Sequence, residues 1–386
     1  MSGFKLNITN KATTRQGRIK TAHGFLATPF FMPDATRAFV KGNTVENVKR
    51  AQTEAMVVNT FHLYLQPGQE IIKKAKGVHK FMNWSQPLLS DSGGFQVFSL
   101  IHRAKGLGKI DDEKVSFRSP IDGSRHELTP EKSIQIQFDL GVDLMVCLDD
   151  CPPNDWPRAD LEIAVKRSLA WALRCKQEYL KQLRKRKISE DKRPLLFSVV
   201  QGGDFEDLRR HCALELIKIG FDGYGFGARP VDKDGNFLAD TLFKTASFLP
   251  ENSLRFALGI GTPEDIYRCY IMGWDMCVCV IPTREGRHGR LFSFKENFRG
   301  FKALSGKNKP IYKYPDFYQT KNISNAIFAK DFSPINKTSD LPELRQYSKA
   351  FLHHLFRLKE PLGQKLASLN NLEFYNRLMR ELRLIK

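Results

Sequence analysis

The segment most able to do chemistry is Leu88-Leu89-Ser90-Asp91-Ser92-Gly93-Gly94-Phe95. It has the pattern of a short buried strand, residues 88–90, that leads directly into a carboxylate and a Ser-Gly-Gly turn. Glycine permits positive φ and close approach to the backbone, so a flat ligand could lie against the main chain beside Asp91. The alternative is a tight turn whose Asp only caps the following helix. Other strand-like runs decide between the two, because several of them also end in polar groups.

Reading the residues that follow these runs gives further candidates for a site. Asp149 and Asp150 follow one run, Gln201-Gly202-Gly203 another, and Gly227 and Thr283-Arg284 two more. An amide beside carboxylates can satisfy the in-plane donors and acceptors of a purine-like base. Each residue alone could be a helix cap or a loop hydrogen bond, but together they favour one shared pocket.

The elements that must position these residues are short apolar runs separated by stretches long enough for a helix. Thr129-Pro130-Glu131 and Thr262-Pro263-Glu264 have the cap and first-turn residues of helix starts. Strands that alternate with helices predict a parallel sheet, and eight such units predict an α/β fold of the closed (β/α)8 TIM-barrel type, with chemistry at the carboxyl ends of the strands. A doubly wound open sheet is the alternative, but no GxGxxG follows the first run. The eight runs are residues 25–33, 55–60, 87–90, 143–148, 195–200, 223–227, 254–260 and 276–282.

Composition limits the partners and the compartment. The 386 residues carry 61 Lys and Arg against 42 Asp and Glu, a net charge of +19, which favours a polyanion, nucleic acid first and an anionic membrane second. The seven cysteines have no CxxC spacing, the amino terminus has no signal-like apolar region, and no membrane-length apolar run occurs. We therefore expect a cytoplasmic protein. Along the chain, we expect residues 1–330 to form the barrel and residues 331–386 a helical carboxyl-terminal appendage.

A set of ordered motifs resembles the tRNA-guanine transglycosylase, or queuine tRNA-ribosyltransferase, family. The resemblance extends from about residue 4 to about residue 383 and rests on many motifs in the same order. They are Val40-Lys41-Gly42, Asn59-Thr60-Phe61-His62-Leu63, Asp91-Ser92-Gly93-Gly94-Phe95-Gln96, Asp122-Gly123-Ser124, Leu128-Thr129-Pro130-Glu131, Asp149-Asp150-Cys151-Pro152-Pro153, Val200-Gln201-Gly202-Gly203, Gly259-Ile260-Gly261-Thr262-Pro263-Glu264-Asp265 and Pro282-Thr283-Arg284.

The resemblance implies a TIM barrel that exchanges a guanine in tRNA for a 7-deazaguanine, queuine or its precursor, at the anticodon wobble position. The chemistry is similar to that of a retaining glycosidase. It implies that Asp91 is the acid/base, that Asp149 and Gln201 read the base edge, that Phe95 stacks on the base and that Gly227 offers backbone contact. Ser92, Gly93 and Gly94 complete the implied base pocket. The implied tRNA-contacting residues are Gly259, Ile260, Gly261, Thr262, Pro263, Glu264, Asp265, Thr283, Arg284, Glu285, Gly286 and Arg287.

The chain departs from the family pattern on the eighth run. At the position where the family has the Asp that acts as covalent nucleophile, this chain has Val278. An isopropyl group cannot attack a ribose carbon, and loss of a nucleophile normally costs orders of magnitude in rate. Asp275 and Cys277 lie an odd number of residues away, so on a regular strand both face the other side. Asp91 acting alone is the better chemical substitute.

Further departures affect the metal and the pocket. The positions of the family's zinc ligands are Ser339, Leu341, Leu344 and Asn370, so we expect no zinc and no other cofactor. Arg229 stands near the implied base pocket, where it could change which base is accepted. Residues 292–320 are longer and more basic than the family pattern implies, so we expect a basic insertion there within the barrel domain.

Three functional hypotheses follow. The first is an active transglycosylase, and the second is a catalytically inactive tRNA-binding paralogue or non-catalytic partner of an active subunit. The third is an unrelated phosphate-binding barrel that uses residues 259–265. The family commonly dimerises through its carboxyl-terminal region, so a homodimer or heterodimer is expected, weakened here by the loss of zinc.

Overall fold

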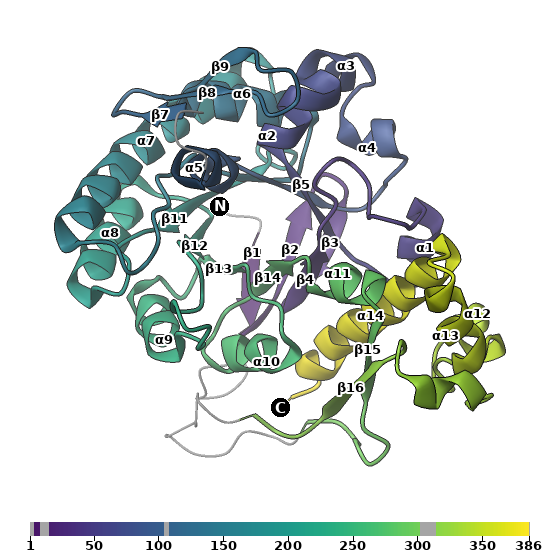
Figure 1. Cartoon of the computed structure of the whole chain (residues 1–386). Coiled ribbons are helices and arrows are strands. Elements are labelled where there is room, and N and C mark those ends of the chain that lie inside the picture. The colour runs from purple at the N-terminus through teal and green to yellow at the C-terminus, as the bar shows by residue number, and fades with distance from the viewer. Residues whose placement is uncertain (1–3, 8–14, 104–107, 302–313, 386) are drawn as a thin grey trace.

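The computed structural model describes residues 4–7, 15–103, 108–301 and 314–385. Its centre is a parallel sheet of eight strands, as the eight apolar runs predict (Figure 1). The first predicted run is divided between two sheets, and the last strand ends early because a helix with Pro282 in its first turn begins at Ile281. In chain order the eight strands are β4 (Phe30–Pro33), β5 (Met56–Asn59), β6 (Leu88–Asp91), β10 (Leu144–Val146), β11 (Leu195–Val200), β12 (Gly223–Phe226), β13 (Leu254–Leu258) and β14 (Met276–Cys279).

The sheet closes on itself. Its neighbour order is β4-β14-β13-β12-β11-β10-β6-β5, and the two end strands are joined by a parallel bridge between Asp34 and Val57. The Ala35 amide donates to the carbonyl oxygen of Val57 at 2.8 Å, and the Asn59 amide donates to the carbonyl oxygen of Thr36 at 3.2 Å. The predicted TIM barrel is therefore confirmed, and the segment that closes it lies just beyond β4.

The barrel interior is a packed core of alternate strand residues. In β4, Phe30 and Met32 belong to the inner core and Phe31, between them, to the outer layer. In β14, Met276 belongs to the inner core and the next residue, Cys277, to the outer layer. This is the period-two alternation of a strand whose two faces are both buried. The antiparallel sheet β1 (Phe4–Asn7), β2 (Gln16–Thr21) and β3 (Gly24–Ala27) adds Ile19 and Leu26 to the inner core.

Helices follow the barrel strands and surround them in Figure 1. Residues 64–68 form a π-helical turn, η1 (Tyr64–Gly68), and the sheet of β7 (Gly108–Ile110), β8 (Val115–Arg118) and β9 (Arg125–Leu128) is inserted between α5 and α6. The helices that follow barrel strands are α1 (Val45–Arg50), α2 (Thr60–Leu63), α3 (Gln69–Lys74), α4 (Val78–Met82), α5 (Gly94–Arg103), α6 (Pro130–Leu140), α7 (Arg158–Lys185), α8 (Glu206–Ile219), α9 (Ala239–Phe248), α10 (Pro263–Ile271) and α11 (Ile281–Arg287).

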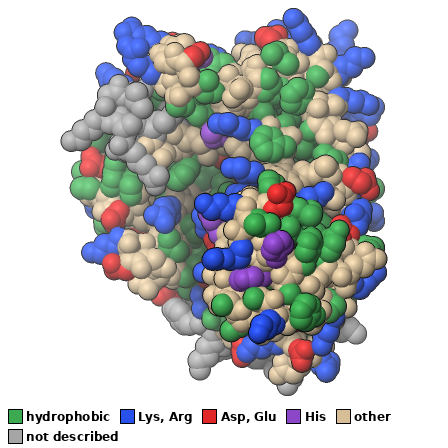
Figure 2. Space-filling model, turned by 45° about the vertical axis from the view of Figure 1, so that its right-hand side comes forward, with side chains coloured by type: hydrophobic (Ala, Val, Ile, Leu, Met, Phe, Trp, Pro, Cys, Tyr) green, Lys and Arg blue, Asp and Glu red, His purple; other side chains and the backbone are tan. Residues whose placement is uncertain are grey.

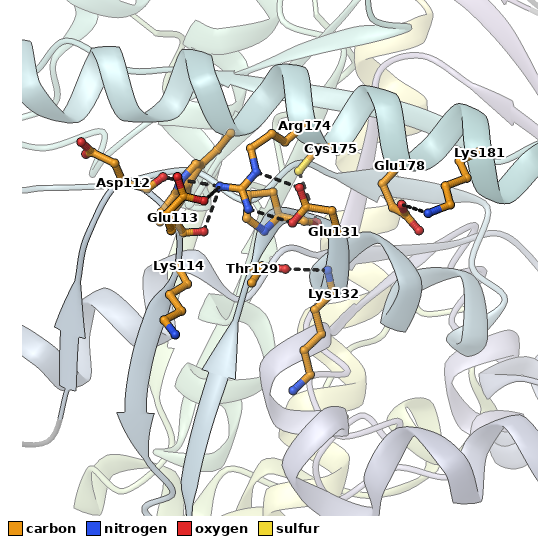
Figure 3. Close-up of polar contacts among 12 residues, drawn as sticks. Asp112, Glu113, Lys114, Thr129, Glu131, Lys132, Arg174, Cys175, Glu178 and Lys181 are labelled. Atoms are coloured by element: carbon orange, nitrogen blue, oxygen red, sulfur yellow. Dashed lines mark hydrogen bonds and ion pairs between the residues drawn. The ribbon is translucent and has the colours of Figure 1, made fainter.

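Arg174 of α7 fastens the inserted sheet to the barrel (Figure 3). Its Nε and Nη2 atoms donate to the two carboxylate oxygens of Glu131 at 2.7 and 2.9 Å, and its Nη1 donates to the carbonyl oxygen of Glu113 at 2.9 Å. Thr129 caps α6, the helix that carries Glu131, by accepting from the Lys132 amide. A bidentate guanidinium–carboxylate pair fixes both the orientation of the two side chains and the distance between them. It therefore holds α6, α7 and the loop before β8 together.

The carboxyl-terminal residues pack on the loops at the carboxyl end of the barrel. Gly286 of α11 lies so close to α14 that a Cβ there would stand 2.6 Å from Cα of Ser368. The side-chain amide of Asn371 donates to the carbonyl oxygen of Pro282 at 2.9 Å, and the Tyr375 hydroxyl donates to that of Gly261 at 2.6 Å. The elements here are β15 (Arg290–Phe294), β16 (Tyr318–Asn322), η2 (Ala326–Lys330), α12 (Pro342–Gln346), α13 (Lys349–Arg357) and α14 (Pro361–Arg383).

The predicted basic insertion corresponds in part to the antiparallel pair β15–β16, and residues 302–313 of it lie outside the described residues. Helices α12, α13 and α14 occupy most of residues 342–383, but the predicted appendage over 331–386 and its boundary at residue 330 stay a prediction. No helix in the described part of the chain has the length and apolarity needed to cross a membrane.

Candidate active site

A cavity of about 470 Å³ opens at the carboxyl ends of the barrel strands. The residues that line it come from all eight strands or from the loops directly after them, as expected for the catalytic end of a TIM barrel. Figure 2 shows a hollow with hydrophobic side chains inside it and Lys and Arg side chains along one side. Asp91, Asp149, Phe95, Gly227, Arg229 and Val278, all singled out from the sequence, line this one cavity.

Asp91 ends β6 and faces the cavity. Its Oδ1 accepts from the Ser92 amide at 3.0 Å, and its Oδ2 accepts from the side-chain amide of Asn59 at 3.2 Å. Burial raises the pKa of Asp91 to about 6, although these two hydrogen bonds favour the charged form and oppose the shift. A carboxyl group with this pKa exchanges protons near neutral pH, as an acid/base catalyst must. Asn59, for which no role was predicted, ends the neighbouring strand β5.

Asp149 follows β10, the strand next to β6, and lines the cavity, whereas its partner Gln201 is buried and does not belong to the cavity wall. The Gln201 side-chain amide donates to Oδ2 of Asp149 at 2.6 Å. Burial raises the pKa of Asp149 to about 7, and the charges of Asp91 and Asp150 add to the shift while the bond from Gln201 opposes it. Asp150, the neighbouring candidate, lies outside this pair and accepts from Arg167 at 2.5 Å.

Glycines create the space for this pair. A Cβ on Gly227 would stand 2.5 Å from Cδ of Gln201 and 2.6 Å from the carbonyl oxygen of Val200. A Cβ on Gly94 would stand 2.8 Å from the carbonyl oxygen of Asp149. Real Cβ contacts are not this short, so any larger residue would displace the strand ends that carry the two polar side chains.

The turn after Asp91 has a backbone conformation and close contacts that require glycine. Gly93 has φ of +88°, and a Cβ there would stand 2.9 Å from Cβ of Phe61. Ser92 is buried; its Oγ accepts from the Gly94 amide at 3.2 Å and its carbonyl oxygen accepts from Ser133 at 3.1 Å. Phe95 is 44% exposed and lines the cavity. An open aromatic face beside two carboxyl groups can stack on a planar ring.

Val278 lies on the inner wall of the cavity, with its aliphatic side chain against the inner core. Its possible replacements on the same strand face elsewhere. Asp275 is fully buried, 3.4 Å from Arg15, and Cys277 belongs to the outer core. Cys279 reaches the cavity wall, but its Sγ accepts from the Ile281 amide and burial raises the pKa of its thiol to about 12.

Asp34, which directly follows β4, also lines the cavity. The predicted candidates came from the residues after five of the runs, and Asp34, after the first run, was not among them. The same rule, applied to the first run, would have found it.

The predicted RNA-contacting loops lie at the rim but serve the fold as well. Gly259, Ile260, Gly261, Thr262, Asp265 and Arg284 line the cavity. Thr262 caps α10 and donates to Oδ2 of Asp265 at 2.6 Å, while Glu264 accepts from the Tyr318 hydroxyl. Pro263, Thr283 and Gly286 are buried, whereas Arg284 is half exposed and lies 3.4 Å from Glu285.

The positions implied for zinc do not fit a metal ion. Leu341 and Leu344 are buried apolar side chains. Ser339 donates to Glu373 at 2.6 Å, and the Asn370 side-chain amide donates to the carbonyl oxygen of Phe292 at 3.0 Å. Zinc sites use thiolate, imidazole and carboxylate ligands, and these four positions offer none of them.

One other group of described residues has metal-ligand chemistry, and it lies at the amino end of the barrel. His23 and His79 both contact Asp143, at 2.9 and 3.2 Å, and their rings stack at 3.6 Å. The hydrogen bond to Asp143 raises the pKa of His23. The group joins the β2–β3 turn to the residue before β10 and takes no part in the cavity.

Comparison with known proteins assigns this arrangement to a family. The family model for queuine tRNA-ribosyltransferase matches residues 10–384. The chain is 39% identical over 390 residues to the queuine tRNA-ribosyltransferase of Thermoanaerobacter pseudethanolicus, covering 99% of this chain and 93% of that protein. It is 38% identical over 369 residues to the enzyme of that name from Halothermothrix orenii, covering 96% and 89%. It is 37% identical over 369 residues to the one from Staphylococcus aureus, covering 96% and 88%. The chain therefore belongs to the queuine tRNA-ribosyltransferase family.

Proposed function

We propose that this protein is a tRNA-guanine transglycosylase, which replaces guanine at the anticodon wobble position of tRNA by a 7-deazaguanine, queuine or its precursor. The observation that carries the proposal is that Asp149, hydrogen-bonded to Gln201, lines the same cavity as Asp91. Family membership over the whole chain supports it. We also propose that the protein acts in the cytoplasm, where a basic protein with free cysteines meets tRNA.

The base-reading role rests on the chemistry of the polar pair. A guanine edge carries both donors and acceptors, and an amide beside a carboxyl group offers both. Because Asp149 has a pKa of about 7, it can accept from a base N–H when ionised or donate when protonated. Phe95 supplies an aromatic face for the same planar ring. The target nucleotide must leave its stack to reach the cavity, as for other enzymes that act on a base.

The proton-handling role goes to Asp91. The N9 atom of the departing guanine needs a proton, and the incoming base must give one up from the equivalent atom. One carboxyl group can do both in turn, as the acid/base of a retaining glycosidase does. Its pKa of about 6 permits donation and acceptance at neutral pH. Asn59 and the Ser92 amide orient the group by holding one oxygen each.

The RNA-binding role rests on charge. The net charge of +19 and the Lys and Arg side chains beside the hollow in Figure 2 suit a phosphate backbone. Arg284 lines the cavity and is half exposed, and Arg287 of the same helix is a second cation near the rim. Dimerisation, as a homodimer or with another subunit, stays a prediction.

A second function is favoured by Val278. A barrel without a nucleophile at that position could bind tRNA without turnover, alone or as the partner of an active subunit. Both functions predict tRNA binding that weakens with salt, so binding alone does not separate them.

The test is incorporation of labelled guanine into tRNA that carries a GUN anticodon. The wild type, Asp91→Asn and Val278→Asp proteins are assayed side by side at equal concentration. Turnover by the wild type that is lost in Asp91→Asn supports the transglycosylase. A wild type that binds this tRNA without turnover, together with a Val278→Asp protein that gains exchange, supports the inactive binding protein instead.

A further inference from the structure

The exchange reaction needs an anionic group that faces the anomeric carbon of the flipped nucleotide, and strand β14 does not supply it. The cavity wall around Val278 is continued by β4, which pairs with β14 in parallel. In this register Val278 lies opposite Met32, with paired strands about 4.8 Å apart. The next residue of β4 on the same face as Met32 is Asp34, since alternate residues share a face.

Burial confirms which way Asp34 points. Phe30 and Met32 belong to the inner core and Phe31 to the outer one, so the residue two beyond Met32 faces the barrel interior. Asp34 is partly buried and lines the cavity together with Val278 and Asp91. Its negative charge contributes to raising the pKa values of both Asp91 and Cys279, which also face the cavity.

The carboxylate of Asp34 is held by one oxygen and open at the other. Its Oδ1 accepts from the Thr36 amide at 3.1 Å and also from the Thr36 hydroxyl. Its Oδ2 has no hydrogen-bond partner among the residues that the structure describes. The backbone that follows Asp34 is fixed to β5 through Ala35 and Thr36. A carboxylate that is fixed on a cavity wall, with one oxygen free of hydrogen bonds to the described residues, suits the role of a nucleophile.

We propose that Asp34 is the covalent nucleophile of this protein, a carboxylate supplied by β4 in place of the one that β14 lacks. The inference rests on the proposed function. Oδ2 of Asp34 bonds to C1′ of the target ribose as the C1′–N9 bond breaks, and the bond's electron pair leaves with guanine. Asp91 gives a proton to N9 of the departing guanine. Asp91 then takes a proton from the incoming base, whose nitrogen bonds to C1′ as the C1′–Oδ2 bond breaks and Asp34 is released as a carboxylate.

Other groups in the cavity are less suitable. Asp265 has one oxygen bonded to Thr262 and the other to Arg268, at 2.6 and 2.9 Å. Cys279 is a thiol that burial keeps protonated. If Asp91 attacked the ribose, it could not also protonate the leaving base, so a second group would be needed for that step.

The substitution that separates catalysis from structure is Asp34→Asn. Asparagine keeps an Oδ1 that accepts from Thr36, so the turn after β4 is preserved, but its amide nitrogen cannot replace the attacking oxygen. Guanine exchange is expected to fall by at least about 10³-fold, with tRNA affinity within about threefold of wild type. Adding Val278→Asp to this variant returns a carboxylate to the same wall and is expected to restore exchange at least about tenfold. Asp234→Asn, at an exposed acid in the loop after β12, is the matched control.

Trapping of the intermediate gives a second, independent readout. Wild-type protein is mixed with an anticodon stem-loop RNA without incoming base, denatured in acid and digested with trypsin. Residues 21–37 form one tryptic peptide in which Asp34 is the only acidic residue, and residues 81–103 form another in which Asp91 is the only one. The ribose adduct is expected on the first peptide, and this measurement does not depend on how any variant folds.

The outcomes are distinct. Exchange that collapses in Asp34→Asn, with the adduct on residues 21–37, supports the inference. Wild-type exchange that Asp34→Asn retains within about fivefold, or an adduct on residues 81–103, overturns it and leaves the transglycosylase standing. A wild type without exchange, under conditions in which Val278→Asp exchanges, overturns both.

Discussion

Replacing Asp149 by asparagine should stabilise the protein, and by more at high pH than at low pH. Burial raises the pKa of Asp149 from 3.8 to about 7, so the folded protein binds this proton more tightly than the unfolded chain does. Wild-type stability is therefore lost as pH rises from about 4 to about 7, since each pKa unit corresponds to about 1.4 kcal/mol. The asparagine side chain of the variant cannot ionise, and its carbonyl oxygen can still accept from Gln201.

The magnitude follows from the two pKa values. The full cost of ionising Asp149 in the folded protein is about 4 kcal/mol near pH 8, and somewhat over one third of it is already present near pH 5. Because the cavity admits some water, which screens the charge, we expect the advantage of Asp149→Asn to grow by about 1–3 kcal/mol between these two pH values.

The assay is equilibrium urea unfolding of the wild type and the variant at both pH values. Other titrating groups, including Asp275 with a pKa of about 6, are present in both proteins and largely cancel in the double difference. Asp234→Asn, at an exposed acid, should show no pH-dependent gain. An Asp149→Asn advantage that is constant within about 0.5 kcal/mol, or that shrinks with pH, would refute the reasoning. The same variant should lose guanine affinity, because asparagine cannot supply the carboxylate that accepts from the N–H groups of the base.

Three more predictions concern the frame and the RNA surface. Arg174→Met should lower the free energy of unfolding by about 1–3 kcal/mol because it leaves Glu131 without its bidentate partner. The control Arg158→Met, which breaks exposed ion pairs only, should cost under about 1 kcal/mol, and equal losses of stability in the two variants would contradict the prediction. Leu344→Ala should cost about 2–4 kcal/mol by urea unfolding, whereas a chelator should leave the melting temperature unchanged; a chelator-induced drop would indicate a bound metal. Arg284→Ala should weaken tRNA binding and lower the log–log salt slope by about one, and an unchanged slope would mean that it contacts no phosphate.

Much of the cavity was predictable because strand ends meet at one edge of a barrel. The apolar runs and the polar residues after them predicted that Asp91, Asp149, Gln201 and Gly227 would share a site, and the structure brings them together. Period-two alternation predicted that Asp275 and Cys277 would face away from the cavity, and they do. The motifs predicted the family, which the relatives confirm.

Tertiary structure decided what no local pattern contains. Whether Asp34 faces Val278 depends on which strands are neighbours when the barrel closes, and β4 and β14 lie about 240 residues apart in the chain. The pKa values of Asp91 and Asp149 depend on how much protein encloses each carboxylate, a property of the assembled cavity. The packing of α14 on α11 likewise brings residues that are distant in the chain into contact. Sequence alone thus determined which chemical groups the strands deliver to the barrel mouth, because residue type and period are local; the closed fold decided which of those groups face one another and how strongly each holds its proton.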